Sequence, residues 1–343
     1  NLVPGPMGEG PMQPWLEALA ADLHEWTDQP FLLILDEYDR SDSADDIQRF
    51  IELLAPLLPK HCKLVINSRT LPRLPWLSLI ARNQAIILED EHLISDDFYD
   101  LRRAEDAPCL EVTALGPGYV SLDGTLITTW EGHLPRLLFF FALDRPTVTR
   151  SEICQAFWPE LDIEQAVNVF HVTKRRLHKA LGEDILVHEQ GYYRVNPSLN
   201  VLYDVMDFVG ALVKGRAAPP EDKVGYWQQA INLYRGPFLQ GHTDHWIESR
   251  RADFRGGYME AITEMAEVRY QQGYKEHALR LYLRALSEDL TQEDLHRRVM
   301  TLFVEMGRRS EAAAHFQKSQ RELKTQGKRF SPEMETIYRE IMS

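Results

Sequence analysis

The chain has 343 residues and a formal net charge of −14, and 44% of its residues are hydrophobic. This length favours two or three domains, and the composition is ordinary for a globular protein. The acidic total argues against indiscriminate nucleic-acid binding. It still allows a local basic surface on one domain, because a phosphate responds mainly to charges within about 10 Å of it.

The longest apolar run, LLFFFAL at residues 137–143, is far shorter than the roughly 18 residues that a membrane span requires. No signal-peptide pattern opens the sequence, which begins with Asn1. The cysteines are odd in number and far apart, at positions 62, 109 and 154, and they lack histidines at metal-ligand spacing. We therefore expect a cytoplasmic protein without disulfides, a metal site or membrane attachment.

Residues 1–107 alternate predicted helices with short apolar runs. Amphipathic helices are predicted at 15–26 and 45–58, and the runs FLLILDEYDRSD (31–42) and CKLVINSRT (62–70) follow them. Short apolar runs separated by helices are typical of buried parallel strands, so this part is predicted to be an α/β unit. The polar stretch 96–108 is the predicted linker to the next domain.

An acidic pair, Asp36 and Glu37, lies at the end of the first apolar run. In nucleoside triphosphatases, carboxylates in this position help to hold Mg²⁺ and to orient the attacking water. However, the sequence contains no phosphate loop of the form GxxxxGKS or GxxxxGKT, and carboxylates at strand ends are also common as plain surface residues. We expect no enzymatic activity and no cofactor in this chain, and ATP with Mg²⁺ would require a phosphate loop encoded upstream.

Residues 108–203 differ in character. The alternating stretch 109–128 is broken by Gly-Pro-Gly and Asp-Gly turn signals, which predicts short antiparallel strands. Three helices are predicted next, at 133–144, 149–161 and 163–182, and a β-hairpin at 185–195 bends at Gly191. Three helices followed by a hairpin is the element order of a winged helix.

The third of these helices carries the densest positive charge. At 100° per residue, one side of residues 165–181 holds the apolar set Ala166, Phe170, Leu177 and Leu181, and the opposite side holds Asn168, Val172, Arg175 and Lys179. Such a face suits a DNA major groove, where Arg binds guanine, Asn reads adenine and Val touches a thymine methyl. The alternative is an ordinary solvated helix face. The sorting of charge favours DNA, since residues 109–200 contain eight Lys and Arg but eleven Asp and Glu.

Residues 204–343 are predicted to be almost entirely helical and repeat at a 34-residue interval. The matching pairs are Gly273 with Gly307, Ala278 with Ala312, Tyr282 with Phe316, and Val268 with Leu302. This is the tetratricopeptide period, in which each repeat is a helical hairpin with a small residue at the helix contact. A final helix is predicted after the Ser-Pro pair at 331–332.

Several of these strings resemble known families. VTKRRLHKAL (172–181) and QGYYRV (190–195) resemble the recognition helix and wing of OmpR-type winged helices. LYRGPFL (233–239), HWIESRR (245–251) and SPEMETIYREI (331–341) resemble the bacterial transcriptional activator domain, a tetratricopeptide-like module. The two modules in this order resemble the SARP-type activators.

The strings FLLILDEYD and LVINSRT resemble the second half of a STAND-type ATPase domain. The expected architecture is therefore multidomain. A partial α/β segment is expected at 1–107, an α+β winged helix at 108–203, and an all-α helical repeat domain at 204–343.

The resemblance to OmpR-type winged helices and the arrangement of residues 165–181 around their helix together predict which residues contact DNA. The candidates are Arg150, Ser151, Asn168, His171, Val172, Lys174, Arg175, Arg176, Lys179, Tyr192 and Arg194. The resemblance also implies that a loop contacts RNA polymerase, formed by Trp158, Pro159, Glu160, Leu161 and Asp162.

The sequence departs from the OmpR-type pattern at two places. Lys174 stands where the family carries Ile or Val, and His188, Glu189 and Gln190 stand where relatives often carry Arg. Glu189 would face phosphates unfavourably. By the same resemblance, Asp204 and Phe208 are expected to brace the winged helix against the activator domain.

The function that the sequence favours is a sequence-specific, DNA-binding transcriptional activator. Its expected partners are double-stranded promoter DNA, RNA polymerase and a second copy of itself on DNA. The alternative is a protein-interaction scaffold or signalling adaptor whose winged helix no longer reads DNA. A nucleotide-driven switch is a third hypothesis, and it requires the missing phosphate loop.

Overall fold

The computed structural model describes residues 12–41, 44–88, 107–182 and 184–342, which fall into two compact units. The first unit takes in the described parts of 1–77, 95–111 and 120–201, and the second those of 78–94, 112–119 and 202–343. Most of the linker predicted at 96–108 lies outside the described residues. No helix in the described part of the chain is long and apolar enough to cross a membrane.

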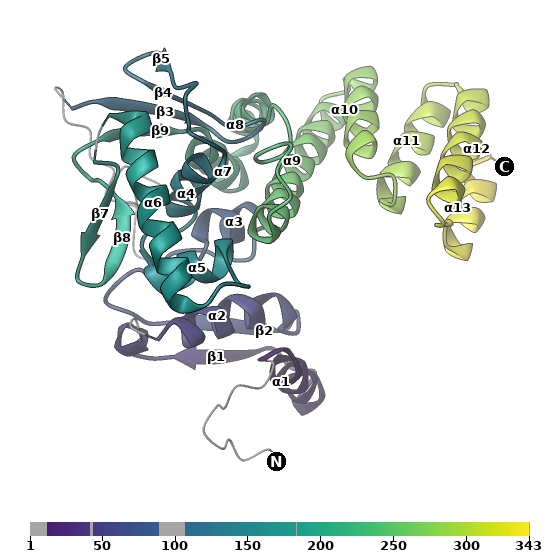
Figure 1. Ribbon diagram of the computed structural model, residues 1–343. Coiled ribbons are helices and arrows are strands. Elements are labelled where there is room, and N and C mark those ends of the chain that lie inside the picture. The colour runs from purple at the N-terminus through teal and green to yellow at the C-terminus, as the bar shows by residue number, and fades with distance from the viewer. Residues whose placement is uncertain (1–11, 42–43, 89–106, 183, 343) are drawn as a thin grey trace. The chain divides into compact units, whose positions relative to one another are not determined.

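The first unit begins with an α/β segment, as predicted (Figure 1). Two strands pair in parallel, from Phe31 opposite Cys62 to Leu35 opposite Ile66. The segment's elements are α1 (Met12–Trp26), β1 (Phe31–Leu35), η1 (Tyr38–Ser41), α2 (Asp45–Leu54), η2 (Ala55–Leu57) and β2 (Cys62–Ile66). The expectation that these strands are buried is wrong for Leu32 and Ile34 of β1, which are 61% and 59% exposed.

The same unit continues with the predicted helix and hairpin elements, which we call the helix–hairpin region. They are α4 (Leu134–Leu143), β6 (Val148–Thr149), α5 (Arg150–Phe157), α6 (Ile163–Leu181), β7 (Leu186–Glu189) and β8 (Tyr192–Val195). The three strands form a small sheet in the order β6-β8-β7. α6 packs on α4 and α5, and the Phe170 and Tyr193 ring centroids lie 5.0 Å apart (Figure 1). Gly191, with φ of 93°, supplies the left-handed conformation of the hairpin turn.

A second sheet has the strand order β5-β4-β3-β9. Its strands are β3 (Cys109–Thr113), β4 (Tyr119–Leu122), β5 (Thr125–Leu126) and β9 (Asn200–Tyr203). The predicted Asp-Gly turn joins β4 to β5, with Asp123 and Gly124 both at positive φ. The Asp123 carboxylate accepts a hydrogen bond from the Cys109 amide at 2.9 Å, which ties this turn to β3.

The second unit is dominated by helices that pack on their neighbours in sequence (Figure 1). They are α7 (Asp204–Ala217), α8 (Pro220–Leu233), α9 (His245–Gln271), α10 (Lys275–Glu288), α11 (Glu293–Glu305), α12 (Arg309–Thr325) and α13 (Pro332–Met342). The residues paired by the 34-residue repeat occupy equivalent places. Gly273 and Gly307 both have positive φ at the turns, while Ala278 and Ala312 are fully buried where helices meet.

Residues 78–88 belong to the second unit, and no pattern in their sequence predicts this. They include most of α3 (Trp76–Ala81), a short helix that the sequence analysis did not predict. Arg216 of α7 donates to the carbonyl oxygens of Ile80 and Ala81 at 2.7 and 2.8 Å, and it also forms a bidentate pair with Glu260. A guanidinium in this position supplies hydrogen bonds to carbonyls at a helix end, and the Ile80 carbonyl also accepts one from the backbone amide of Asn83 at 2.9 Å.

Candidate nucleic-acid interface

α6 is fixed at both ends by its own sequence. The Asp162 carboxylate accepts a hydrogen bond from the Gln165 amide at 2.8 Å, which caps the N-terminus. Gly182, with φ of 70°, ends the helix in the left-handed conformation. Phe170 and Leu177 are fully buried, so the predicted apolar side faces the core.

The opposite side of α6 faces solvent, as the helical-face reading predicts. Val172 is 47% exposed, so an apolar side chain lies on the surface among these cations. The other exposed members of this face are Asn168, His171, Arg175, Arg176 and Lys179. These residues occupy one continuous surface, which we call the basic face of α6.

Two cations of the basic face are engaged by one carboxylate. Glu131, in the loop between β5 and α4, forms a short hydrogen bond with Lys179 and lies 3.9 Å from the Arg176 guanidinium. The bond from Lys179 holds the pKa of the Glu131 carboxyl below its ordinary value. All three side chains are exposed, so phosphate oxygens can replace Glu131 at little cost. No local pattern predicts this pairing, because Glu131 lies 48 residues from Lys179 in a loop.

Arg175 is exposed, and no carboxylate pairs with it among the described residues. It is therefore the cation of the basic face that is most available to DNA. Lys174 behaves differently: it is half-buried, and its ammonium lies 5.3 Å from the centre of the Tyr193 ring. A cation over an aromatic face is stabilised by the ring's quadrupole, so Lys174 packs on the hairpin while its neighbours face solvent.

The hairpin carries the residues predicted to contact the DNA backbone, and its arginine forms an ion pair within the hairpin. The Arg194 guanidinium pairs with the Glu189 carboxylate of β7 at 2.8 Å. Glu189 thus neutralises the hairpin arginine, in line with the weak wing expected from the sequence. Tyr192 is half-buried, and the Arg73 guanidinium lies 5.3 Å from the centre of its ring.

The N-terminus of α5 completes the candidate surface. Thr149 and Glu152 form a reciprocal capping box there, and the next residues, Arg150 and Ser151, are exposed. A cleft of about 470 Å³ connects this helix end to the hairpin turn. It is lined by Thr149, Arg150, Ser151, Cys154, Gln155, Trp158, Pro159, Leu161, Ile163, Ala166, Val167 and Gly191.

The predicted polymerase loop lies along the same cleft. Trp158 is buried and anchors the loop, while Pro159, Glu160 and Asp162 are exposed. Leu161 is half-buried, and the adjacent Ile163 is 85% exposed. The loop follows the C-terminal end of α5 and presents polar and apolar side chains along the cleft that also reaches the N-terminus of α5.

The acidic pair of the α/β segment lies on the surface. The Asp36 carboxylate accepts a hydrogen bond from the Asn67 amide at 2.7 Å, and Glu37, with φ of 49°, pairs with Arg40 at 2.9 Å. Within the described residues, no group of His, Cys, Asp and Glu side chains is arranged to hold a metal ion. Asp36 and Glu37 thus form contacts with Asn67 and Arg40 that do not depend on a bound nucleotide.

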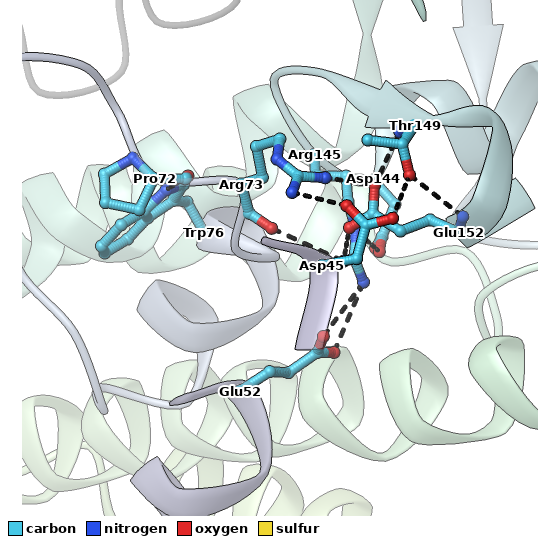
Figure 2. A network of polar contacts seen from close by, with 9 residues as sticks. All are labelled: Asp45, Glu52, Pro72, Arg73, Trp76, Asp144, Arg145, Thr149 and Glu152. Atoms are coloured by element: carbon cyan, nitrogen blue, oxygen red, sulfur yellow. Dashed lines mark hydrogen bonds and ion pairs between the residues drawn. The ribbon is translucent and has the colours of Figure 1, made fainter. Parts of the chain in front are cut away.

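A polar cluster that the sequence analysis missed joins the α/β segment to the helix–hairpin region (Figure 2). Arg73, only 3% exposed, pairs with Asp45 at 2.8 Å and with Glu152 at 2.5 Å. Arg145 pairs with Glu52 at 3.2 Å, and the Thr149 hydroxyl donates to Asp45 at 2.7 Å. Burial raises the pKa of Glu152 although both arginines lower it. These partners are far apart in sequence, so no local pattern could reveal them.

Asp204 joins the start of the predicted activator domain to the predicted winged-helix segment 108–203, as expected of a brace. Its carboxylate accepts hydrogen bonds from the Ala114 and Leu115 amides at 2.8 and 3.1 Å, and all three residues belong to the second unit. Burial raises the pKa of Asp204 to about 6. Phe208 is fully buried within α7. Asp204 thus links residues on both sides of the predicted boundary at 203 within one compact unit, whereas Phe208 packs inside the predicted activator domain, with its ring centroid 6.0 Å from that of Tyr234.

The C-terminal part of the chain is similar to a known family of domains. Residues 204–342 match the family model described as bacterial transcriptional activator domain. The regulatory protein AfsR of Streptomyces griseus is 27% identical over 201 residues, which cover 52% of this chain and 21% of AfsR. The chain thus spans about a fifth of the length of that relative.

A solved structure shares the fold. The structure of Mycobacterium tuberculosis EmbR in complex with a low affinity phosphopeptide superposes with a TM-score of 0.55 at 20% sequence identity. The match covers 68% of this chain and 65% of the EmbR chain. The mixed α/β region followed by a helical region is therefore an EmbR-like arrangement.

Proposed function

We propose that this regulator, whose residues 204–342 form a bacterial transcriptional activator domain, is a sequence-specific DNA-binding activator. In this proposal, residues 108–203 are an OmpR-type winged helix, and α6 enters the major groove. The β7–β8 hairpin is its wing. The helical repeats of 204–343 provide dimerisation or regulatory contacts, and the loop 158–162 contacts RNA polymerase. The α/β segment is the second half of a STAND-type ATPase domain that retains no catalytic role in this chain.

The observation that carries the proposal is the basic face of α6. It combines exposed Arg175, Arg176 and Lys179 with the exposed apolar Val172, opposite a fully buried Phe170. Cations alone would give a sequence-independent phosphate contact. An apolar residue and Asn168 among them supply the chemistry that distinguishes bases in the major groove.

The α5 N-terminus supports the same orientation of the duplex. Its backbone amides and exposed Arg150 and Ser151 suit a DNA phosphate, since helix N-termini bind anions. With Tyr192 and Arg194 of the hairpin, they flank α6 at one end. A duplex whose groove receives α6 would therefore have its backbone held by residues outside that helix.

The test is a selection of bound duplexes from a random pool, followed by measurement of affinity for the selected sequence. Arg175→Ala with Arg176→Ala should abolish specific binding while circular dichroism and thermal unfolding stay unchanged, because both side chains are exposed. The matched control is Lys318→Ala with Arg321→Ala, which removes two exposed cations from α12. If the double variant of α6 binds the selected duplex as tightly as the control, the assignment of α6 is wrong.

The alternative function is a protein-interaction scaffold or signalling adaptor. The observation in its favour is that carboxylates already engage three of the candidate cations, through Glu131 and Glu189. Retention on heparin at low salt separates the two functions. A DNA-binding protein should be retained and should elute with salt, whereas a scaffold of net charge −14 should flow through.

A further inference from the structure

The α/β segment touches the helix–hairpin region at the end of α5 that is suited to a phosphate. Asp45, the first residue of α2, accepts a hydrogen bond from the Thr149 hydroxyl at 2.7 Å. Thr149 is the N-cap of α5 and immediately precedes Arg150 and Ser151. The Asp45 carboxylate is therefore an anion held at a helix N-terminus, which is the place that a backbone phosphate would take.

A second contact reaches the hairpin from the same segment. The Arg73 guanidinium, paired with both Asp45 and Glu152, lies 5.3 Å from the centre of the Tyr192 ring. Tyr192 is one of the candidate backbone contacts of the wing. Asp45 and Arg73 thus engage the two elements that would hold the DNA backbone, the α5 N-terminus and the hairpin.

The segment that makes these contacts is acidic. Its described residues in the first unit, 12–41 and 44–77, contain ten Asp and Glu and six Lys and Arg, a net of −4. A negative segment next to a phosphate-binding surface repels DNA through the potential that it adds there. Its effect comes in addition to the direct competition between Asp45 and a phosphate.

The contact between the α/β segment and the helix–hairpin region is one that can separate. Its polar part, drawn in Figure 2 beside Pro72 and Trp76, consists of charged and hydroxyl side chains, and α2 packs mainly on α1 and η2. Buried ion pairs add little net stability, because the desolvation of the charges offsets their attraction. Separation would return Asp45, Glu52 and Arg145 to water.

We propose that the α/β segment is an acidic cover that competes with the DNA backbone for the α5 N-terminus and the hairpin, held closed by Asp45 and Glu52. This inference rests on the proposed DNA-binding function. In the closed state the segment occupies the phosphate-binding end of the interface, and its release raises the affinity for DNA.

The test uses the full chain with Asp45→Ala and Glu52→Ala. The matched control is Asp46→Ala with Glu25→Ala, which removes the same charge from exposed positions, one of them next to Asp45. Binding is measured by fluorescence anisotropy with a labelled mixed-sequence duplex of about 30 bp at about 50 mM salt. Hydrogen exchange of α2 and α5 reports independently whether the cover has opened.

We expect the D45A/E52A chain to bind the duplex about tenfold more tightly than the wild type, roughly 1.4 kcal/mol, with faster exchange in α2 and α5. The control pair should bind like the wild type within about threefold. Adding Arg175→Ala and Arg176→Ala to the D45A/E52A chain should remove the gain, because the released surface acts together with α6.

Three results would overturn the inference. Faster exchange without tighter binding would show that the cover does not compete with DNA. Unchanged exchange would show that Asp45 and Glu52 do not hold it closed. If exchange accelerates but neither the wild type nor any variant binds the duplex, the proposed function itself fails, and the inference fails with it.

Discussion

Adjacent glycines in α9, Gly256 and Gly257, should respond in opposite directions to the same substitution. A Cβ on Gly256 would have only the Arg82 Cγ near it, at 4.0 Å. A Cβ on Gly257 would lie 2.6 Å from the Leu212 Cδ1 and 3.0 Å from the Ala81 carbonyl oxygen. Both residues lie inside the helix, so the local conformational gain from alanine is the same at each.

The magnitudes follow from these contacts. Gly256→Ala should stabilise the protein by about 1 kcal/mol, the difference in helix propensity. At Gly257 the Leu212 methyl can shift, but the Ala81 carbonyl is held by Arg216 at 2.8 Å. Overpacking costs about 1–3 kcal/mol, and weakening a hydrogen bond to a charged group costs about 1.5–3 kcal/mol. After the helix gain of about 1 kcal/mol is subtracted, Gly257→Ala should destabilise the protein by about 1.5–5 kcal/mol.

Urea unfolding followed by circular dichroism measures the difference from the shift of the midpoint at constant slope. Hydrogen exchange of α9 assigns the change to that helix. Leu212→Ala combined with Gly257→Ala removes the side-chain clash but leaves the carbonyl contact. If G257A is as stable as G256A, the close packing of α3 on α9 is refuted. If the double variant is as stable as L212A alone, the carbonyl contact is not the cause.

The remaining predictions concern charge and protonation. Glu131→Gln should raise DNA affinity several-fold at low salt, because it frees Lys179 and Arg176 for phosphates; anisotropy measures this, and an unchanged affinity would show that Glu131 does not compete. Thermal unfolding should show that the free energy of unfolding of the helical repeats falls by roughly 2 kcal/mol between about pH 7.5 and about pH 5, the range in which histidine titrates. The reason is that burial lowers the pKa of His315 to about 4 in the folded protein, whereas the ordinary value is 6.5. The stability that depends on neutral His315 is therefore fully present above about pH 6.5 and is lost as the pH falls toward about 4. His315→Phe should flatten this dependence, and an equally steep dependence in that variant would place the titrating group elsewhere.

The protonation of the buried pair His296 and His315 depends on contacts that the tertiary structure makes. His296 lies within hydrogen-bond distance of the Leu290 carbonyl and of His315, both at 2.9 Å. The carbonyl can only accept, so the Nε2 of His296 donates to it. When His296 is neutral, its Nδ1 accepts from the Nε2–H of His315, so two neutral rings satisfy these contacts. Burial lowers the pKa of each, because a charge here would have to leave water.

The sequence by itself determined the elements whose information is local. The apolar period of residues 165–181, the cap at Asp162 and the end at Gly182 define α6, because helix faces and ends depend on neighbours within a few residues. The glycine bend of the hairpin and the 34-residue repeat are equally local or periodic. The match of residues 204–342 to the activator domain agrees with the strings that suggested it.

Only the tertiary structure decided which charges meet. Arg73 pairs with Glu152, 79 residues away, and Lys179 pairs with Glu131, 48 residues away. Lys174 lies on Tyr193 because the hairpin folds back against α6. An ion pair leaves no periodic trace in sequence, since any acidic residue can partner any basic one that the fold brings within reach. The availability of the basic face of α6, and the cover proposed for the end of α5, are therefore properties of the folded chain alone.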